Sequence, residues 1–172
     1  MTAASREPGA DAHPHAELDA LTEPVRAHAE RALRAGDRLD RLIPGFLLDS
    51  PVSLVGYRWG TAVGWAWGSL WSTGVVERHA GLWVFRGMPA WAFPRGGVCV
   101  GGCFLTGDRP LRDELLRHEG VHREQWRRYG FLMPLLYLLA GRDPLRNRFE
   151  IAAGLRAGGY VRARRRTARA QD

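Results

Sequence analysis

The sequence predicts an α+β domain in which several helices accompany a small antiparallel sheet, and the sheet precedes a helix that carries two histidines. Three observations predict this arrangement. Glycines recur at every fourth residue between residues 52 and 76, which is a helical period. Short segments rich in β-branched and aromatic residues and bounded by glycine lie between residues 81 and 105, as is typical of strands. A single helical face is then formed by Leu111, Leu115, His118, His122 and Trp126.

Length and composition indicate one globular domain. The chain has 172 residues, is 45% hydrophobic and contains seven tryptophans, which is enough to build a core. Its net charge of +7 comes from arginine alone, because all 25 basic residues are arginine. An arginine-only, Ala- and Gly-rich composition is typical of a GC-rich bacterial genome, and no nucleic-acid-binding motif accompanies it. We therefore expect no specific nucleic-acid partner.

The two ends of the chain differ from its middle. Residues 1–16 are rich in Ala, Pro, Gly and charge, and we expect a disordered lead there. The domain should occupy residues 17–160, and residues 161–172 should form a disordered basic tail whose arginines could meet phosphates or an anionic membrane. The first 20 residues lack a basic region followed by an apolar run, so no signal peptide is predicted and a cytoplasmic location is the default.

The first helix should begin near Thr22 and end near Leu42, before the break at Pro44-Gly45. A second helix is predicted within residues 52–76, where Arg58 is the only charged residue. Its glycine row (Gly56, Gly60, Gly64 and Gly68) would let another backbone approach closely, and a row of tryptophans lies beside it. Either this helix packs inside a soluble domain, or it inserts into or lies on a membrane, since its uncharged stretch is long enough for both.

Three strands are predicted, at residues 81–87, 91–93 and 98–105. Residues 94–97 supply a turn, and Gly101-Gly102 suggests a bulge within the third strand. Cys99 and Cys103 would then share one face of that strand about 13 Å apart, which is too far for a direct disulfide. We interpret them as small core residues, with a redox or iron–sulfur role as the alternative, although two cysteines alone cannot complete such a cluster.

The helices of the second half are bounded by clear signals. Asp108 and Pro110 should open a helix that ends at Tyr129, before Gly130. Residues 131–140 form an apolar segment too short to span a bilayer and are predicted to be a buried helix. A last helix is expected over residues 145–157, ended by Gly158-Gly159.

The main functional candidate is the sequence His118-Glu119-Gly120-Val121-His122. Histidines four residues apart lie on one side of a helix, one turn apart, so both can reach a single zinc ion. Glu119 lies about 100° around the helix, where it can act on water at the open side of the metal. The alternative is a pair of core or surface histidines with no metal, but unligated inward imidazoles are costly unless they are hydrogen-bonded.

A catalytic zinc needs a third protein ligand. The H-E-x-x-H-x-x-G-x-x-H subclass is excluded, because Gln125 and Arg128 stand where Gly and His are required. Glu150, on the last predicted helix and 28 residues after His122, is the preferred third ligand. A salt bridge to arginine or simple exposure would be its alternative roles. Three weaker ligand candidates remain open: Asp143, His79 and Glu124.

These residues carry a resemblance. The chain resembles small bacterial proteins of unknown function that are described as gluzincin-type zinc metallopeptidases. These proteins share the motifs H-E-x-x-H-x-x-Q-W, Y-G and N-x-F-E-x-x-A, which lie here within residues 117–126, the pair Tyr129-Gly130 and residues 147–153. The resemblance covers roughly residues 95–160 and implies a minimal zincin-like fold. It also implies His118, His122 and Glu150 as zinc ligands and Glu119 as the base. Better-known gluzincins often have an acid where this chain has Gly154, so a second-sphere partner of the histidines is missing or comes from elsewhere.

The function predicted from the sequence is a zinc-dependent hydrolase of peptide or protein substrates, with Glu119 as general base. A donor for the developing oxyanion could be Tyr129, Tyr137 or Arg148, but Tyr160 is preferred because Gly158-Gly159 could turn it back toward the metal. The alternative is a zinc-binding structural or regulatory protein without turnover. Peripheral contact with a membrane, through residues 52–76 or the basic tail, is compatible with both.

Overall fold

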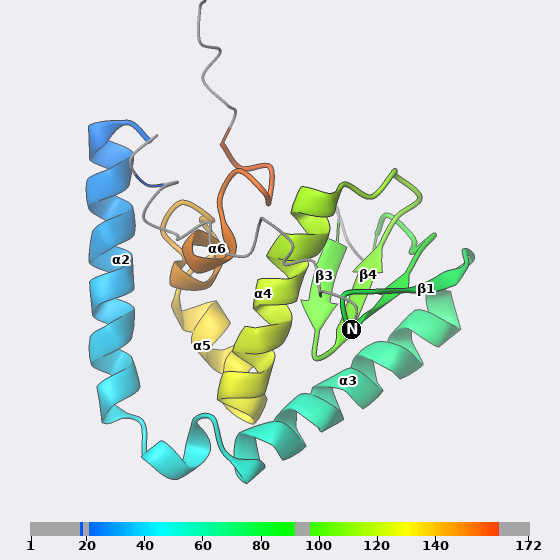
Figure 1. Cartoon of the computed structure of the whole chain (residues 1–172), viewed down its shortest axis with the longest axis horizontal. Helices are drawn as coiled ribbons and strands as arrows, with labels where there is room; N and C mark the ends of the chain where they lie inside the picture. The colour runs from blue at the N-terminus through cyan, green and yellow to red at the C-terminus, as the bar shows by residue number, and fades with distance from the viewer. Residues whose placement is uncertain (1–17, 19–20, 92–96, 162–172) are drawn as a thin grey trace, which may run out of the picture.

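The fold is that of a computed structural model, which describes Leu18, residues 21–91 and residues 97–161 (Figure 1). The α-helices are α2 (Glu23–Leu42), α3 (Pro51–Trp71), α4 (Asp113–Tyr129), α5 (Met133–Leu139) and α6 (Arg148–Ala153). Two short 3₁₀ helices are η1 (Gly45–Leu47) and η2 (Gly130–Leu132). The strands are β1 (Val76–His79), β2 (Leu82–Phe85), β3 (Gly97–Val100) and β4 (Cys103–Thr106). The predicted α+β class is therefore confirmed, whereas both expected disordered ends lie outside the described residues, apart from residue 161.

The four strands form one mixed sheet in the order β1-β2-β4-β3. The two hairpins, β1–β2 and β3–β4, are antiparallel, but β2 and β4 run parallel where the hairpins meet. The expectation of a purely antiparallel sheet was therefore wrong. Pattern alone cannot give the pairing between two hairpins, because a strand presents the same alternation to a parallel and to an antiparallel neighbour.

The expected strand at residues 98–105 is in fact two strands. Gly101 adopts a left-handed φ of 60° and, with Gly102, makes the turn between β3 and β4 instead of a bulge. Glycine suits this position because it tolerates positive φ, and a Cβ on Gly101 would also meet the backbone of α3 at Thr61. Of the strand expected at residues 91–93, Trp91 lies in a turn and the rest is outside the described residues.

The sheet lies between α3 and α4, as its alternating side chains require. Leu82, Val84 and Phe104 pack together with leucines at the start of α4. Phe85 and Cys103, which point to the opposite face, come against the glycine row of α3. Successive strand residues face opposite sides of a sheet, so β2 and β4 at its centre are largely buried on both faces, whereas β1 at the edge is partly exposed.

The helical interpretation of residues 52–76 is confirmed for most of that stretch: α3 runs from Pro51 to Trp71 and buries Gly56, Gly60, Gly64 and Gly68, whereas Val76 begins β1. A Cβ at Gly60 would lie 2.7 Å from the ring of Trp126, and one at Gly68 would lie 2.5 Å from the ring of Phe85. The row therefore lets α3 pack directly on α4, η2 and the sheet. No helix in the described part of the chain is long and apolar enough to cross a membrane.

Replacing Gly56 by alanine should lower the free energy of unfolding by about 1–3 kcal/mol, because the new methyl would collide with the backbone of Gly130 and Phe131. Gly120→Ala in α4 is the matched control, because nothing lies within 4 Å of a Cβ there. Because alanine has a higher helix propensity than glycine, Gly120→Ala should leave the free energy of unfolding at the wild-type value or raise it by up to about 1 kcal/mol. Urea denaturation of both variants measures the difference, and equal losses would contradict the close packing of α3.

Helix α4 crosses the centre of the molecule and separates the sheet from α5 and α6 (Figure 1). It begins at Asp113, not at Asp108: Asp108 and Arg109 form a bend, and Arg112, with an extended backbone, is its N-terminal cap residue. Helix α6 is also shorter than the expected 145–157, since Asn147 caps its start by accepting a hydrogen bond from the Phe149 N–H. Gly154, with a φ of 97°, ends it.

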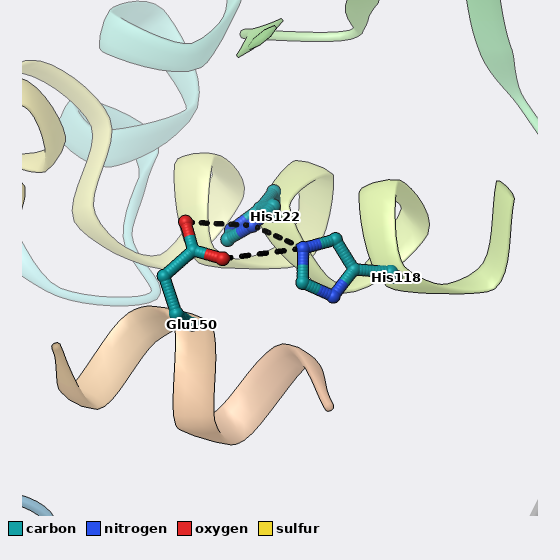
Figure 2. A group of neighbouring side chains, drawn as sticks. All are labelled: His118, His122 and Glu150. Carbon is teal, nitrogen blue, oxygen red and sulfur yellow. Dashed lines mark hydrogen bonds and ion pairs between the residues drawn. The ribbon is translucent and has the colours of Figure 1, made fainter. Parts of the chain in front are cut away.

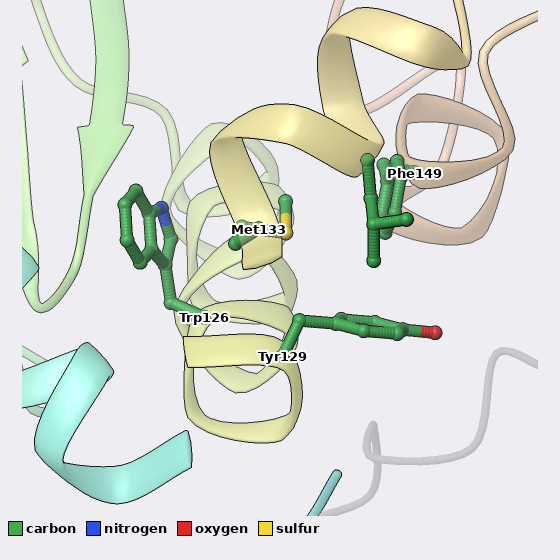
Figure 3. Close-up of a cluster of buried hydrophobic side chains, with 5 residues drawn as sticks. Trp126, Tyr129, Met133 and Phe149 are labelled. Carbon is green, nitrogen blue, oxygen red and sulfur yellow. The ribbon is translucent and has the colours of Figure 1, made fainter. Parts of the chain in front are cut away.

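One hydrophobic cluster fixes α6 and α5 against α4 (Figure 3). It is made of Trp126, Tyr129, Met133, Leu136 and Phe149. Phe149 immediately precedes Glu150, and its ring packs edge-on against Tyr129 at 5.5 Å. The core therefore holds the backbone of Glu150 in register with the histidine face of α4.

Candidate metal centre

The structure brings His118 and His122 of α4 together with Glu150 of α6 (Figure 2). The two Nε2 atoms are 3.1 Å apart, and the Glu150 carboxylate oxygens lie 3.3 Å from Nε2 of His118 and 3.5 Å from Nε2 of His122. Ligand atoms that each lie about 2.0–2.1 Å from a tetrahedral zinc are about 3.3 Å from one another. The three side chains therefore already have the mutual spacing of a zinc ligand set.

The outer nitrogens of both imidazoles are held by hydrogen bonds. Nδ1 of His118 lies 3.1 Å from the carbonyl oxygen of Ala153 and 3.0 Å from that of Gly154. Because a carbonyl only accepts, Nδ1 is the donor, so in a neutral imidazole the lone pair lies on Nε2. The polypeptide itself thus fixes the tautomer that metal binding requires.

Gln125 does the same for His122. Its amide nitrogen donates to the carbonyl of Phe149 at 3.0 Å, so its Oε1, 2.8 Å from Nδ1 of His122, is the acceptor. In their neutral forms, the two imidazoles would therefore present Nε2 lone pairs to each other at 3.1 Å. Two acceptors this close repel unless a proton or a metal ion lies between them, and a metal ion would satisfy both at once.

The electrostatics of the centre favour a cation as well. Burial raises the pKa of Glu150, but its interactions with the imidazoles of His118 and His122 and with the Tyr137 hydroxyl outweigh burial and hold that pKa well below its usual range. Burial lowers the pKa of His122, yet Glu150 and Glu119 raise it by more. The centre thus favours an ionised carboxylate at Glu150 and positive charge at His122.

Glu119 lies beside the three ligand candidates and is 6% exposed. Burial raises its pKa, and the positive charge that His122 and His118 can carry partly opposes this shift. Within the described part of the chain its Oε2 has no hydrogen-bond partner. A buried carboxylate oxygen without a partner next to a candidate metal site is free to bind water or substrate.

Two of the four candidate oxyanion donors lie next to the centre. The ring of Tyr160 is 6.1 Å from that of His118, and a Cβ at Gly158 would lie only 2.7 Å from Cε1 of His118, so glycine allows this turn to approach. Tyr137 donates its hydroxyl hydrogen bond to Oε1 of Glu150. Burial and that carboxylate raise the pKa of Tyr137, which keeps it a donor.

The other two donors are directed elsewhere. Tyr129 donates to Asp40 at 2.5 Å, and Arg148 pairs with Asp40 at 2.8 Å, so both tie α2 to the helices behind the centre. Glycine at position 36 makes room for Arg148, whose Cδ would otherwise meet a Cβ there. Neither side chain is available to the metal centre in this arrangement.

The weaker ligand candidates also lie outside the cluster. Asp143 caps a turn by accepting from the Leu145 N–H, His79 pairs with Glu77 on β1, and Glu124 pairs with arginines on the outer face of α4. Cys99 and Cys103 lie on neighbouring strands and on opposite faces of the sheet, so the expectation that they share one face of one strand was wrong. Burial raises the pKa of both thiols, that of Cys103 to about 12. They remain neutral thiols, in keeping with small core residues.

Comparison of the chain with protein-family models, with curated proteins and with solved structures finds no match. The geometry of the centre therefore carries the functional argument.

Sequence reasoning did not assign a role to Gln125, although the Q of the H-x-x-Q-W pattern marks its place one turn after His122. Gln125→Leu should weaken zinc binding by about 10–100-fold, because His122 loses the acceptor that fixes its tautomer. Competition with a chelating dye measures this. Gln125→Glu, which keeps the acceptor, should lose less. Unchanged affinity in Gln125→Leu would remove Gln125 from the metal centre.

Proposed function

We propose that the protein is a zinc-dependent hydrolase of the peptidase type, with His118, His122 and Glu150 as zinc ligands and Glu119 as general base. The observation that carries the proposal is the facing pair of Nε2 atoms, 3.1 Å apart, with the Glu150 carboxylate within 3.5 Å of both. Three protein ligands leave a fourth tetrahedral position free, which is typical of catalytic zinc and not of structural zinc.

Zinc held there would supply Lewis acidity, which polarises a carbonyl group and lowers the pKa of water to about 7. The role of Glu119 is to take a proton from water and pass it to the leaving amine, for which its buried, unpartnered Oε2 is suited. Tyr160 is our preferred donor to the developing oxyanion, since it lies beside His118 and is 41% exposed, so a substrate can reach it.

One observation favours a second candidate, a structural or regulatory zinc protein without turnover. His118, Glu119, His122 and Glu150 are each 7% exposed or less. A zinc ion in such an enclosed site would connect α4 to α6 and stabilise the fold whether or not a substrate can enter. The two candidates differ in turnover and agree in the metal.

Metal analysis of the purified protein tests the shared part of the proposal: we expect about one zinc per chain, and none in His118→Ala or His122→Ala. Zinc-dependent cleavage of a peptide library, lost with a chelator and restored by zinc, tests the hydrolase. A folded wild-type protein that takes up no zinc would refute both candidates. One zinc per chain without cleavage of any peptide would leave the structural candidate.

A further inference from the structure

One side of α3, next to the glycine row, is an apolar surface that stays largely exposed in the described fold. It consists of Val52, Val55, Trp59, Val63, Trp67, Leu70 and Trp71, of which Leu70 is 69% and Val55 56% exposed. We call these seven residues the outer face of α3. The buried glycine row lies beside this surface on the same helix, and it is the glycine row that packs α3 against α4, η2 and the sheet. Monomeric proteins seldom expose contiguous apolar surfaces of this kind without a partner.

Aromatic contacts extend this surface at both ends. Trp59 packs on Phe131 of η2 at 5.7 Å, and Trp71 packs on Trp67 at 6.0 Å and on Trp91 at 5.3 Å. Phe131 and Trp91 are themselves 50% and 66% exposed. Tryptophan is enriched where an apolar medium meets water, because its ring combines a large apolar area with an N–H donor.

The charges of the surface select the partner. Helix α3 carries no acidic residue, and its only charged side chain is Arg58, which is exposed. Helices η2 and α5 carry no charged side chain. The acids that flank α3 are neutralised by arginines, since Asp49 pairs with Arg128 at 3.3 Å and Glu77 with Arg86 at 3.5 Å.

We propose that the outer face of α3 binds in plane to an anionic lipid surface. The apolar and tryptophan side chains would enter the boundary between headgroups and acyl chains, while Arg58 pairs with a lipid phosphate. In-plane binding agrees with the finding that no described helix can cross a membrane. The net charge of +7 adds a general attraction to anionic lipid.

A second copy of the chain fits this surface less well. A self-associated pair would bring two positively charged molecules together, and the outer face offers no acid to pair Arg58 of the other copy. A buried charge without a partner is costly, whereas an anionic headgroup supplies one.

Co-sedimentation of the full-length, zinc-loaded protein with vesicles tests the proposal. Vesicles of phosphatidylcholine with phosphatidylglycerol should bind the wild type, and phosphatidylcholine alone should bind it more weakly. The double variant Val55→Gln/Leu70→Gln should bind the anionic vesicles at least about tenfold more weakly than the wild type, because it removes the two most exposed side chains of the outer face of α3. Arg58→Gln should lose about fivefold on anionic vesicles and little on neutral ones.

Val121→Gln is the matched control, since Val121 is 36% exposed but lies on α4. It should bind vesicles like the wild type. Equal binding by the wild type and the double variant, or no binding by the wild type, would overturn the proposal. The proposal would also be overturned if light scattering after size exclusion showed the wild type as a dimer and the double variant as a monomer. Zinc content should not differ among these proteins, so the outcome is separate from that of the metal centre.

Discussion

Glu119→Gln should retain about one zinc per chain and lose peptide hydrolysis by about 10²–10⁴-fold, which is the usual contribution of a general base. The reason is the separation of roles within one helix. His118 and His122 point their Nε2 atoms at Glu150, whereas Glu119 has a buried Oε2 with no hydrogen-bond partner in the described structure. An amide in that place keeps the volume and the neighbours but cannot accept a proton from water.

The measurement pairs zinc content with the rate of cleavage of the peptides that the wild type cleaves. Glu124→Gln is the control, because Glu124 lies on the same helix but its side chain is 60% exposed and pairs with arginines. It should keep both zinc and rate. A Glu119→Gln protein that cleaves at the wild-type rate would exclude Glu119 as the base, and one that loses its zinc would make Glu119 a ligand.

The parts of the centre that follow from local geometry could be predicted from the sequence. The four-residue spacing of His118 and His122 places both on one side of any helix, and inward-facing neighbours decide which side. Glu150 could be selected because a carboxylate among Phe149, Ile151 and Ala153 is unusual for a buried helix face. The glycine row predicted the close packing of α3 for a similar reason, since glycines at every fourth residue leave one side of a helix without side chains, where another element can approach closely.

The parts that depend on contacts between distant segments could not be predicted. The backbone carbonyls of Ala153 and Gly154 serve as the partner of His118, and a carbonyl leaves no signal in residue identity. The resemblance noted in the sequence suggested an acid at the position of Gly154 as a partner of the histidines, but the backbone provides the partner of His118 instead. The parallel pairing of β2 with β4 is likewise a tertiary fact, since both strands are four residues long and apolar.

Glu150→Ala should weaken zinc binding by more than about 100-fold, because removal of a direct ligand should cost more than loss of a second-sphere partner. Without its carboxylate, two imidazoles from one helix face each other with nothing from α6 to complete the centre. Glu150→Asp should be intermediate, since its shorter side chain moves the oxygen by about one bond length compared with a Zn–O distance of about 2.0–2.2 Å.

Chelator competition gives the affinities, and thermal unfolding with and without zinc gives an independent reading. Zinc that binds only the folded state stabilises it by RT ln(1 + [Zn]/Kd), so at a zinc concentration well above both Kd values a 100-fold loss of affinity removes about 2.7 kcal/mol of that stabilisation. The stabilisation should fall in the order wild type, Glu150→Asp, Glu150→Ala. Asp143→Ala and Glu124→Ala are the controls, because both carboxylates are exposed and engaged elsewhere.

The outcome for Glu150 also decides how α6 is held. Phe149 anchors α6 in the hydrophobic core, and a bond from Glu150 to zinc would anchor the same helix to α4. Zinc should therefore protect the backbone amides of α6 from hydrogen exchange. In Glu150→Ala, zinc should no longer slow the exchange of the α6 amides. The exchange of the α3 amides should be the same in the variant as in the wild type. Wild-type affinity in Glu150→Ala, together with a loss in Asp143→Ala or Glu124→Ala, would assign the third ligand to another carboxylate. The short distances between Glu150 and the two histidines would then be an ion pair and nothing more.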